Sequence, residues 1–99
     1  AYDKALAIDG NDPDVLTDQA IMFRQLGWHE KAIETFQQAN KLNPEHVNSL
    51  FNMGIVYMQD LGDYEKAQAA LRRFLELVPS GPSADRAKRM IAHMEAGHD

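Results

Sequence analysis

The side chains best suited to chemistry in this sequence are the carboxylates of one acidic run and four histidines. A calcium-binding loop beginning at Asp9 would need a ligand and a glycine where Pro13 and Asp14 stand, and a closing glutamate where Ala20 stands. No two histidines are four residues apart, the spacing that places two metal ligands on one helix face; they are His29, His46, His93 and His98. The sequence therefore predicts a turn and a helix cap at the acidic run, surface histidines and no metal site.

Patterns typical of catalysis are also missing from the sequence. It contains no glycine-rich phosphate loop, no nucleophile elbow and no pair of carboxylates in an evident cleft. The absence of cysteine excludes disulfides and thiolate ligands, and is compatible with a cytoplasmic or a periplasmic compartment. We therefore expect neither an enzyme nor a bound cofactor, and assign no catalytic residue.

The charge balance indicates which partners to expect. The 99 residues carry a formal net charge of −5, which argues against nucleic acid because phosphate binding needs a concentrated basic surface. No apolar run approaches the roughly 18 residues that a membrane span needs, so direct membrane insertion is not expected. Proteins and peptides remain as partners. The chain starts at Ala1 inside a helical pattern, so we expect it to be a piece of a longer protein.

An internal repeat organises the chain. The stretch Gly27–Pro44, GWHEKAIETFQQANKLNP, returns as Gly62–Pro79, GDYEKAQAALRRFLELVP, and a truncated copy, YDKALAIDG, opens the chain. The interval between matching positions is 34 residues once and 35 residues once. A period of this length is typical of stacked helical units, none of which can bury its apolar face alone.

Apolar spacing and capping residues divide the chain into helices. The expected segments are Ala1–Ile8, Pro13–Leu26, His29–Leu42, about Glu45–Gln59, one capped by Asp63 that ends near Val78, and an amphipathic one from about Ser83 with Ala84, Ala87, Ile91 and Met94 on one face. Asp12 with Pro13, and Asn43 with Pro44, fit a cap followed by a proline in the first turn. The longer interval puts one extra residue into the connection at 59–62, where either the turn bulges or the helix continues.

These positions resemble the tetratricopeptide repeat (TPR) signature of large apolar, Leu, Gly, Tyr, Ala, Phe and Pro residues. The matching residues are Leu16, Ala20, Phe23, Ala32, Phe36, Ala39 and Pro44 in one unit, and Leu50, Met53, Gly54, Tyr57, Ala67, Leu71 and Pro79 in the next. The resemblance implies an all-α fold, a right-handed superhelix (α-solenoid) of antiparallel helix pairs in a single domain, 1–99. Its parts would be the second helix of a truncated repeat (1–10), two full repeats (12–45 and 46–80) and a capping helix (83–96).

The resemblance also implies where binding occurs, because in this family the first helix of each pair lines a concave face that holds peptides or protein segments. The residues that the core stripe leaves free on those helices are Asp14, Thr17, Asp18, Ile21, Arg24, Gln25, Asn48, Phe51, Asn52, Ile55, Met58 and Gln59. The apolar ones could form the floor of a groove, or could pack against a neighbouring pair. A carboxylate clamp of the kind found in some members is not expected, since Thr17 and Ile21 stand where it needs a basic residue and an asparagine.

Two functions are compatible with these features. The first is an adaptor that binds a protein segment in the concave groove. The alternative is a structural spacer or a self-association domain, forming a homo-oligomer through the apolar side of the first helix at Tyr2, Ala5, Leu6 and Ile8. Trp28 can be an exposed contact or lean on adjacent helices, and Arg86 and Arg89 can add positive charge to the groove or simply face solvent.

Overall fold

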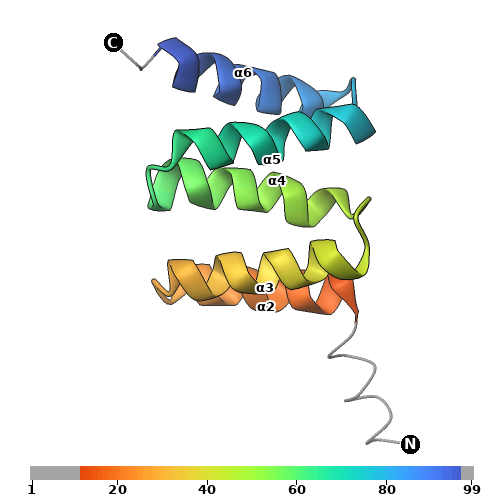
Figure 1. Ribbon diagram of the computed structural model, residues 1–99, viewed down its shortest axis with the longest axis vertical. Coiled ribbons are helices and arrows are strands. Elements are labelled where there is room, and N and C mark those ends of the chain that lie inside the picture. The colour runs from red at the N-terminus through yellow and green to blue at the C-terminus, as the bar shows by residue number, and fades with distance from the viewer. Residues whose placement is uncertain (1–11, 97–99) are drawn as a thin grey trace, which may run out of the picture. The chain divides into compact units, whose positions relative to one another are not determined.

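Every regular element in the described part of the chain is a helix. The computed structural model describes residues 12–96, and its elements are α2 (Pro13–Gln25), α3 (His29–Leu42), α4 (Val47–Ile55), the π-helical turn η1 (Val56–Asp60), α5 (Tyr64–Leu77) and α6 (Pro82–Ala96) (Figure 1). The predicted all-α class is therefore confirmed. The helix predicted at Ala1–Ile8, with the self-association surface placed on it, lies outside the described residues.

The chain divides into two compact units, one ending at Ser49 and the other beginning at Leu50. The division falls inside α4, whose first turn belongs to the first unit and whose remainder belongs to the second. The first unit thus contains the helices α2 and α3. The second contains most of α4 together with η1, α5 and α6.

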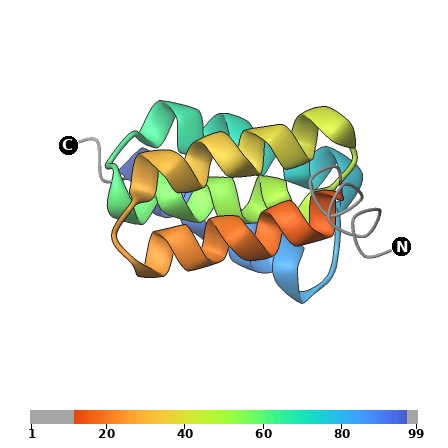
Figure 2. The same cartoon turned by 90° about the horizontal axis from the view of Figure 1, so that it is seen from below.

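In the first unit, α2 and α3 run antiparallel and are joined by a tight turn (Figure 2). α2 begins where predicted, because Asp12 Oδ1 accepts the Asp14 N–H at 2.9 Å and Pro13 occupies the first turn. After α2 ends, Gly27 takes a φ of 85°, in the left-handed region that glycine adopts without steric cost. The buried apolar side chains of this pair are Leu16, Ala20, Ala32, Ile33, Phe36 and Ala39.

The connection between α3 and α4 corrects one prediction. Asn43 and Pro44 do not cap and open the next helix; they form a turn in which the His46 N–H donates to the Asn43 carbonyl at 2.9 Å. α4 therefore begins at Val47, two residues later than predicted. His46 caps it instead, since His46 Nδ1 accepts the Ser49 N–H at 3.3 Å. The prediction failed because an asparagine before a proline suits a turn as well as a helix start.

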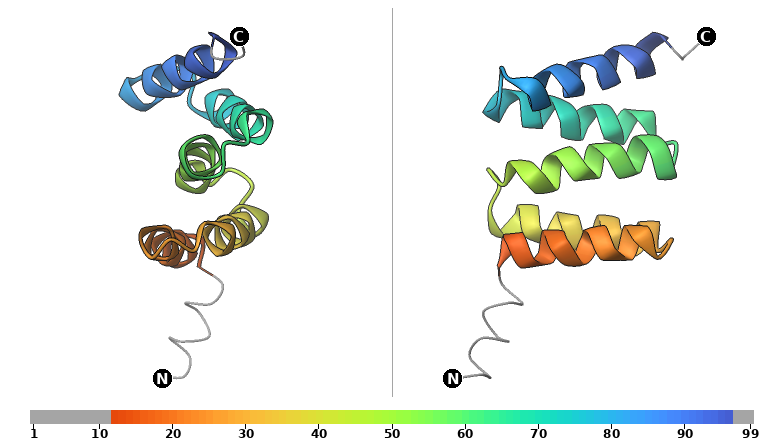
Figure 3. Two further views of the ribbon diagram at one scale, coloured as in Figure 1. Left: turned by 90° about the vertical axis from the view of Figure 1, so that its left-hand side faces the viewer. Right: turned by 180° about the vertical axis from the view of Figure 1, so that it is seen from behind.

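In the second unit, α5 contacts both η1 and α6 (Figure 3). Asp63 caps α5 as predicted, its carboxylate accepting the Lys66 N–H at 3.1 Å. α4 and α5 approach closely at Gly54, where an added Cβ would lie 2.5 Å from Leu71 Cδ2. The buried apolar side chains of this unit are Leu50, Met53, Ile55, Val56, Tyr57, Ala67, Leu71, Phe74, Ala84, Ala87, Met90 and Met94.

The extra residue of the 35-residue interval is absorbed by η1. The Leu61 N–H donates to the Val56 carbonyl at 3.0 Å, a bond to the residue five positions earlier rather than four. The turn then closes as its counterpart does in the first unit. The Asp63 N–H donates to the Tyr57 carbonyl at 2.8 Å, just as the Trp28 N–H donates to the Phe23 carbonyl at 2.8 Å. The sequence left open a bulged turn or a continuing helix. The structure shows that the helix continues, with the extra residue accommodated in a π-helical turn.

Candidate functional site

The predicted binding residues of α2 form a row along that helix. Asp14 and Asp18 are exposed, Ile21 and Arg24 are half-buried, and Gln25 is exposed. Successive members of this set are three or four residues apart, which places them on one face of the helix. We call Asp14, Asp18, Ile21 and Arg24 the α2 row. It combines carboxylates, one aliphatic side chain and one guanidinium.

The remaining candidates lie on α4 and η1. Asn48 and Gln59 are exposed, and Phe51, Asn52 and Met58 are half-buried. We call these five residues the α4 row. Four polar candidates of the two rows already take part in interactions within the chain, so a ligand would exchange with existing contacts there; they are Arg24, Asn48, Asn52 and Gln59.

Two predicted binding residues are not left free by the core. Thr17 is only 4% exposed and Ile55 only 8% exposed. Both residues lie at the edge of the apolar stripe of their helix. Neighbouring positions on a helix differ by about 100° in direction, so a residue next to the stripe can be buried with it. The Thr17 hydroxyl also has no hydrogen-bond partner among the described residues. Thr17 and Ile55 are therefore interior residues.

An aspartate of the α2 row is joined to the start of α4 by a histidine. His46 Nε2 lies 2.6 Å from Asp14 Oδ1. Because His46 Nδ1 accepts the Ser49 N–H, the ring carries its proton on Nε2 and donates it to the carboxylate. The Ser49 hydroxyl in turn donates to the His46 carbonyl at 2.8 Å. His46, which the sequence predicted to be an ordinary surface histidine, thus caps a helix and holds Asp14.

Phe51 of the α4 row is enclosed on two sides. Its ring centroid lies 5.0 Å from that of Phe74 of α5, with the planes inclined at 51°. The Arg86 guanidinium of α6 lies over the Phe51 ring, 5.5 Å from its centroid. Phe51 is therefore part of the packing of the second unit, and only part of its ring remains available to a ligand.

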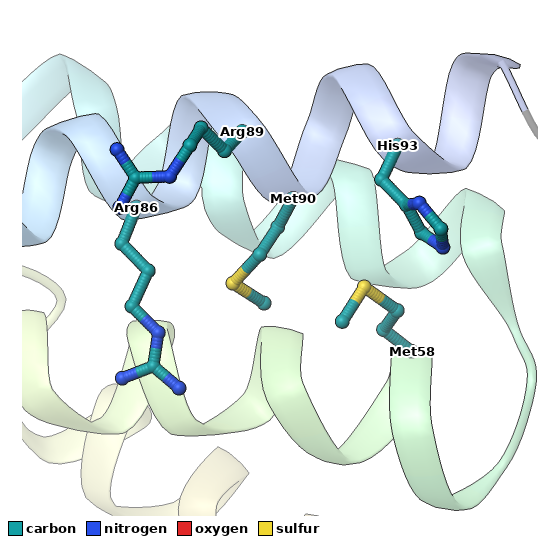
Figure 4. A pocket seen from close by; sticks show the side chains of 5 residues that line it. All are labelled: Met58, Arg86, Arg89, Met90 and His93. Carbon is teal, nitrogen blue, oxygen red and sulfur yellow. The ribbon is translucent and has the colours of Figure 1, made fainter.

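A pocket of about 300 Å³ opens between η1 and α6 (Figure 4). Its lining residues are Met58, Arg86, Arg89, Met90 and His93. The sequence had singled out Met58 and the two arginines for a groove; it had predicted His93 to be a surface histidine and had not assigned Met90 to a site. Their spacing of four and seven residues from Arg86 is a signal that could have found them. The predicted buried face of α6 is corrected here as well, because Met90 is buried and Ile91 only half-buried.

Trp28 combines the two roles that the sequence left open. Its ring stacks on Phe23, with centroids 5.7 Å apart and planes inclined at 23°. Lys31 Nζ lies 5.5 Å from the centroid of the Phe23 ring. Trp28 nevertheless remains 54% exposed, at a turn where Met22 and Leu26 are exposed too. The first unit thus exposes three large apolar side chains, Met22, Leu26 and Trp28, which we call the apolar patch.

Within residues 12–96 the structure holds no cluster of acidic residues, histidines or cysteines able to bind a metal ion. In the same range no helix combines the length and the apolar character that crossing a membrane requires.

Comparisons with known proteins agree with the helical repeat. Three family models match the chain, two described as tetratricopeptide repeat at residues 1–34 and 48–81 and one described as TPR repeat at residues 22–60. A relative from Mycosarcoma maydis, the small glutamine-rich tetratricopeptide repeat-containing protein 2, is 31% identical over 80 residues, which are 81% of this chain. The chain spans only 22% of that relative's length.

Two solved structures share the fold. The type III secretion translocator chaperone SycD of Yersinia enterocolitica superimposes with a TM-score of 0.84 at 15% identity, covering 99% of this chain and 76% of that one. PcrH, in complex with the chaperone binding region of PopD, superimposes with a TM-score of 0.82 at 22% identity, covering 97% of this chain and 75% of that one. With the repeat spacing, the paired helices and three matching family models in agreement, the chain belongs to the tetratricopeptide repeat family.

Proposed function

We propose that this domain is an adaptor that binds a segment of a partner protein along the first helices of its repeats. Tetratricopeptide repeats form protein–protein interaction modules. The surface that we propose for this chain consists of the α2 row and the α4 row. The observation that carries it is the composition of the α2 row and the α4 row. Each keeps apolar side chains partly exposed beside polar ones, with Ile21 on α2 and Phe51 and Met58 on α4 and η1. Such a mixture suits a peptide that supplies apolar anchors and hydrogen-bonding groups.

The solved relatives support the same function. PcrH was solved with a segment of another protein bound, the chaperone binding region of PopD. SycD, the other solved structure described above, is a type III secretion translocator chaperone. Since both share the fold of this chain, the fold is compatible with holding a protein segment.

A peptide-display selection tests the proposal. A random peptide library would be selected against the immobilised 99-residue chain, and the dissociation constants of the enriched peptides measured by fluorescence anisotropy. Changing Ile21→Asn should weaken binding by roughly fivefold or more, because an apolar anchor of about 1 kcal/mol is lost. Met22→Asn is the matched control, since Met22 follows Ile21 on the same helix but belongs to the apolar patch. Enrichment of no peptide, or equal binding by both variants and the wild type, would overturn the proposal.

Self-association is the second candidate, and one observation favours it. Met22, Leu26 and Trp28 are each at least half exposed, and exposed apolar patches often mark contacts between proteins. Light scattering over a range of concentrations distinguishes the two functions. A dimer that Leu26→Asn dissociates would support self-association, whereas a monomer at every concentration would eliminate it.

A further inference from the structure

The pocket between η1 and α6 brings together two methionine sulfurs and one imidazole ring. Met58 of η1 and Met90 of α6 turn their thioether groups toward one another across the opening, and the ring of His93 stands beside Met58 (Figure 4). All five residues that line the pocket belong to the second unit. Two elements of one unit therefore supply three side chains of the kinds that bind soft metal ions.

The elements that carry these side chains determine their placement. Met90 and His93 are three residues apart on α6, so they lie on one face of that helix, and Met58 comes from the π-helical turn. Met90 is 9% exposed, Met58 is half-buried and His93 is exposed. The pocket is thus sheltered at Met90 and open to solvent at His93, which gives an ion a path of entry.

The chemistry of the three side chains selects the ion. Thioether sulfur is polarizable, and as a ligand it selects copper(I), while imidazole also binds copper well. Zinc is held in proteins by thiolates, imidazoles and carboxylates instead. The chain contains no cysteine, so no thiolate competes for a soft ion. The other three methionines are Met22, which is exposed on α2, and Met53 and Met94, which are buried in the core.

The two arginines of the pocket limit the charge that a bound ion can carry. Figure 4 shows Arg86 reaching toward α4, and the guanidinium of Arg89 on the side of Met90 away from Met58. The Arg86 guanidinium lies over the Phe51 ring, 5.5 Å from its centroid. Both positive charges therefore stand at the edge of the pocket. Because Coulomb repulsion is proportional to the charge of the ion, a divalent ion experiences about twice the repulsion of a monovalent one.

We propose that Met58, Met90 and His93 form a copper(I) site, with both sulfurs and one imidazole nitrogen as ligands. This site is independent of the proposed adaptor function. The sequence predicted no metal site because of its histidine spacing and its lack of cysteine, and that prediction did not extend to thioether ligands. A bound ion connects η1 to α6 and therefore stabilises the folded second unit.

A titration followed by NMR tests the site in the wild-type chain. Silver(I), an air-stable ion of the same charge and softness, is the first probe, and copper(I) kept reduced with ascorbate under argon is the second. The ε-methyl signals of the methionines, assigned with Met→Leu variants, are followed in the 99-residue chain. The signals of Met58 and Met90 should shift and saturate at one ion per chain, while that of Met22 stays in place. Equal shifts at Met22, or no saturation, would overturn the site.

Single substitutions test each ligand. Met58→Leu and Met90→Leu remove a sulfur but keep an apolar side chain of similar volume, and His93→Gln removes the imidazole. Each should weaken the binding of silver(I) and copper(I) roughly tenfold or more, measured by competition with a chromogenic chelator. Met22→Leu is the matched control, because it removes an exposed thioether elsewhere, and its affinity should equal that of the wild type. Undiminished affinity in any of the three pocket variants would contradict the three-ligand site.

Two further measurements test the choice of ion and its link between the elements. Zinc(II) should bind roughly tenfold more weakly than copper(I) or not at all. Equal zinc(II) affinity that His93→Gln abolishes would overturn the preference for a soft monovalent ion. Saturating silver(I) should raise the midpoint of thermal denaturation of the wild type but not that of Met90→Leu. An unchanged midpoint in the wild type would mean that no ion joins η1 to α6.

Discussion

At the scale of single residues, small side chains decide how closely helices approach. Ala20, Ala32 and Ala67, which match small positions of the TPR signature, are fully buried. Gly54 is the extreme case, since an added Cβ would lie 2.5 Å from Leu71 Cδ2 and 2.6 Å from Leu71 Cγ. Leu71 is itself fully buried, and close packing of a protein interior leaves a buried side chain little room to shift. The close approach of α4 and α5 therefore depends on a residue without a side chain.

We expect overpacking in Gly54→Ala to lower the free energy of unfolding by about 1–3 kcal/mol. The higher helix propensity of alanine should offset roughly 1 kcal/mol of that loss. Urea denaturation followed by circular dichroism measures the change. In a Leu71→Ala background, where space has been made, the same substitution should be neutral or stabilising. Equal costs in the two backgrounds would show that Leu71 is not the residue in the way.

Residue positions in the repeat also led to the candidate site. Repeat spacing and the family resemblance predicted the positions of the α2 row and the α4 row, and residue type alone drew attention to Arg86 and Arg89. The sequence could not show that Thr17 and Ile55 are interior, because burial at the edge of a stripe depends on a fraction of a helical turn. Nor could it find the role of His46, which depends on Asp14, 32 residues away in sequence.

At the scale of elements, the helix at His29–Leu42 and the caps at Asp12 and Asp63 could be predicted, because local chemistry determines them. The start of α4 and the π-helical turn could not. Asn43 and Pro44 fit two local structures, and the extra residue near η1 could have been placed in the turn or in the helix. In each case the local residues fit both structures, so the local sequence alone does not decide between them.

Shortening η1 tests this account of the extra residue. Deleting Asp60 should convert η1 to regular α-helix and change the free energy of unfolding by no more than about 1 kcal/mol, since one interaction of Asp60 is lost while the helical bonding improves. Deleting Gln68 from the middle of α5 is the matched control. It should cost about 3 kcal/mol or more, because every later core residue of α5 turns by about 100°. Backbone NMR shifts and thermal denaturation measure both changes, and similar costs for the two deletions would contradict the account.

At the scale of the whole molecule, the chain consists of two compact units that share one helix. The boundary between Ser49 and Leu50 lies within α4, and a helix cannot be half-unfolded without losing backbone hydrogen bonds at the break. The family and the all-α class could be predicted from the sequence, because the repeat interval and several residue types agree in both copies. This division inside a helix could not, since nothing in the sequence marks residue 49 or 50.

The shared helix leads us to expect cooperative unfolding. Trp28 is the single tryptophan and lies in the first unit, so its fluorescence reports that unit, whereas far-ultraviolet circular dichroism reports all helices. In urea the two signals should have the same midpoint and slope, as a two-state transition requires. A fluorescence transition that precedes or follows the dichroism transition would mean that the units unfold independently.

The column formed by Phe74, Phe51 and Arg86 has a consequence for ionic strength. Two tilted rings link α5 to α4, and a guanidinium over a ring links α4 to α6. The Arg72–Glu95 pair between α5 and α6 is exposed, with side chains 59% and 56% accessible. Concentrated salt screens an exposed ion pair but weakens ring packing little. α6 should therefore stay docked in molar sodium chloride, held by its buried alanines and methionines after its surface ion pair has ceased to contribute.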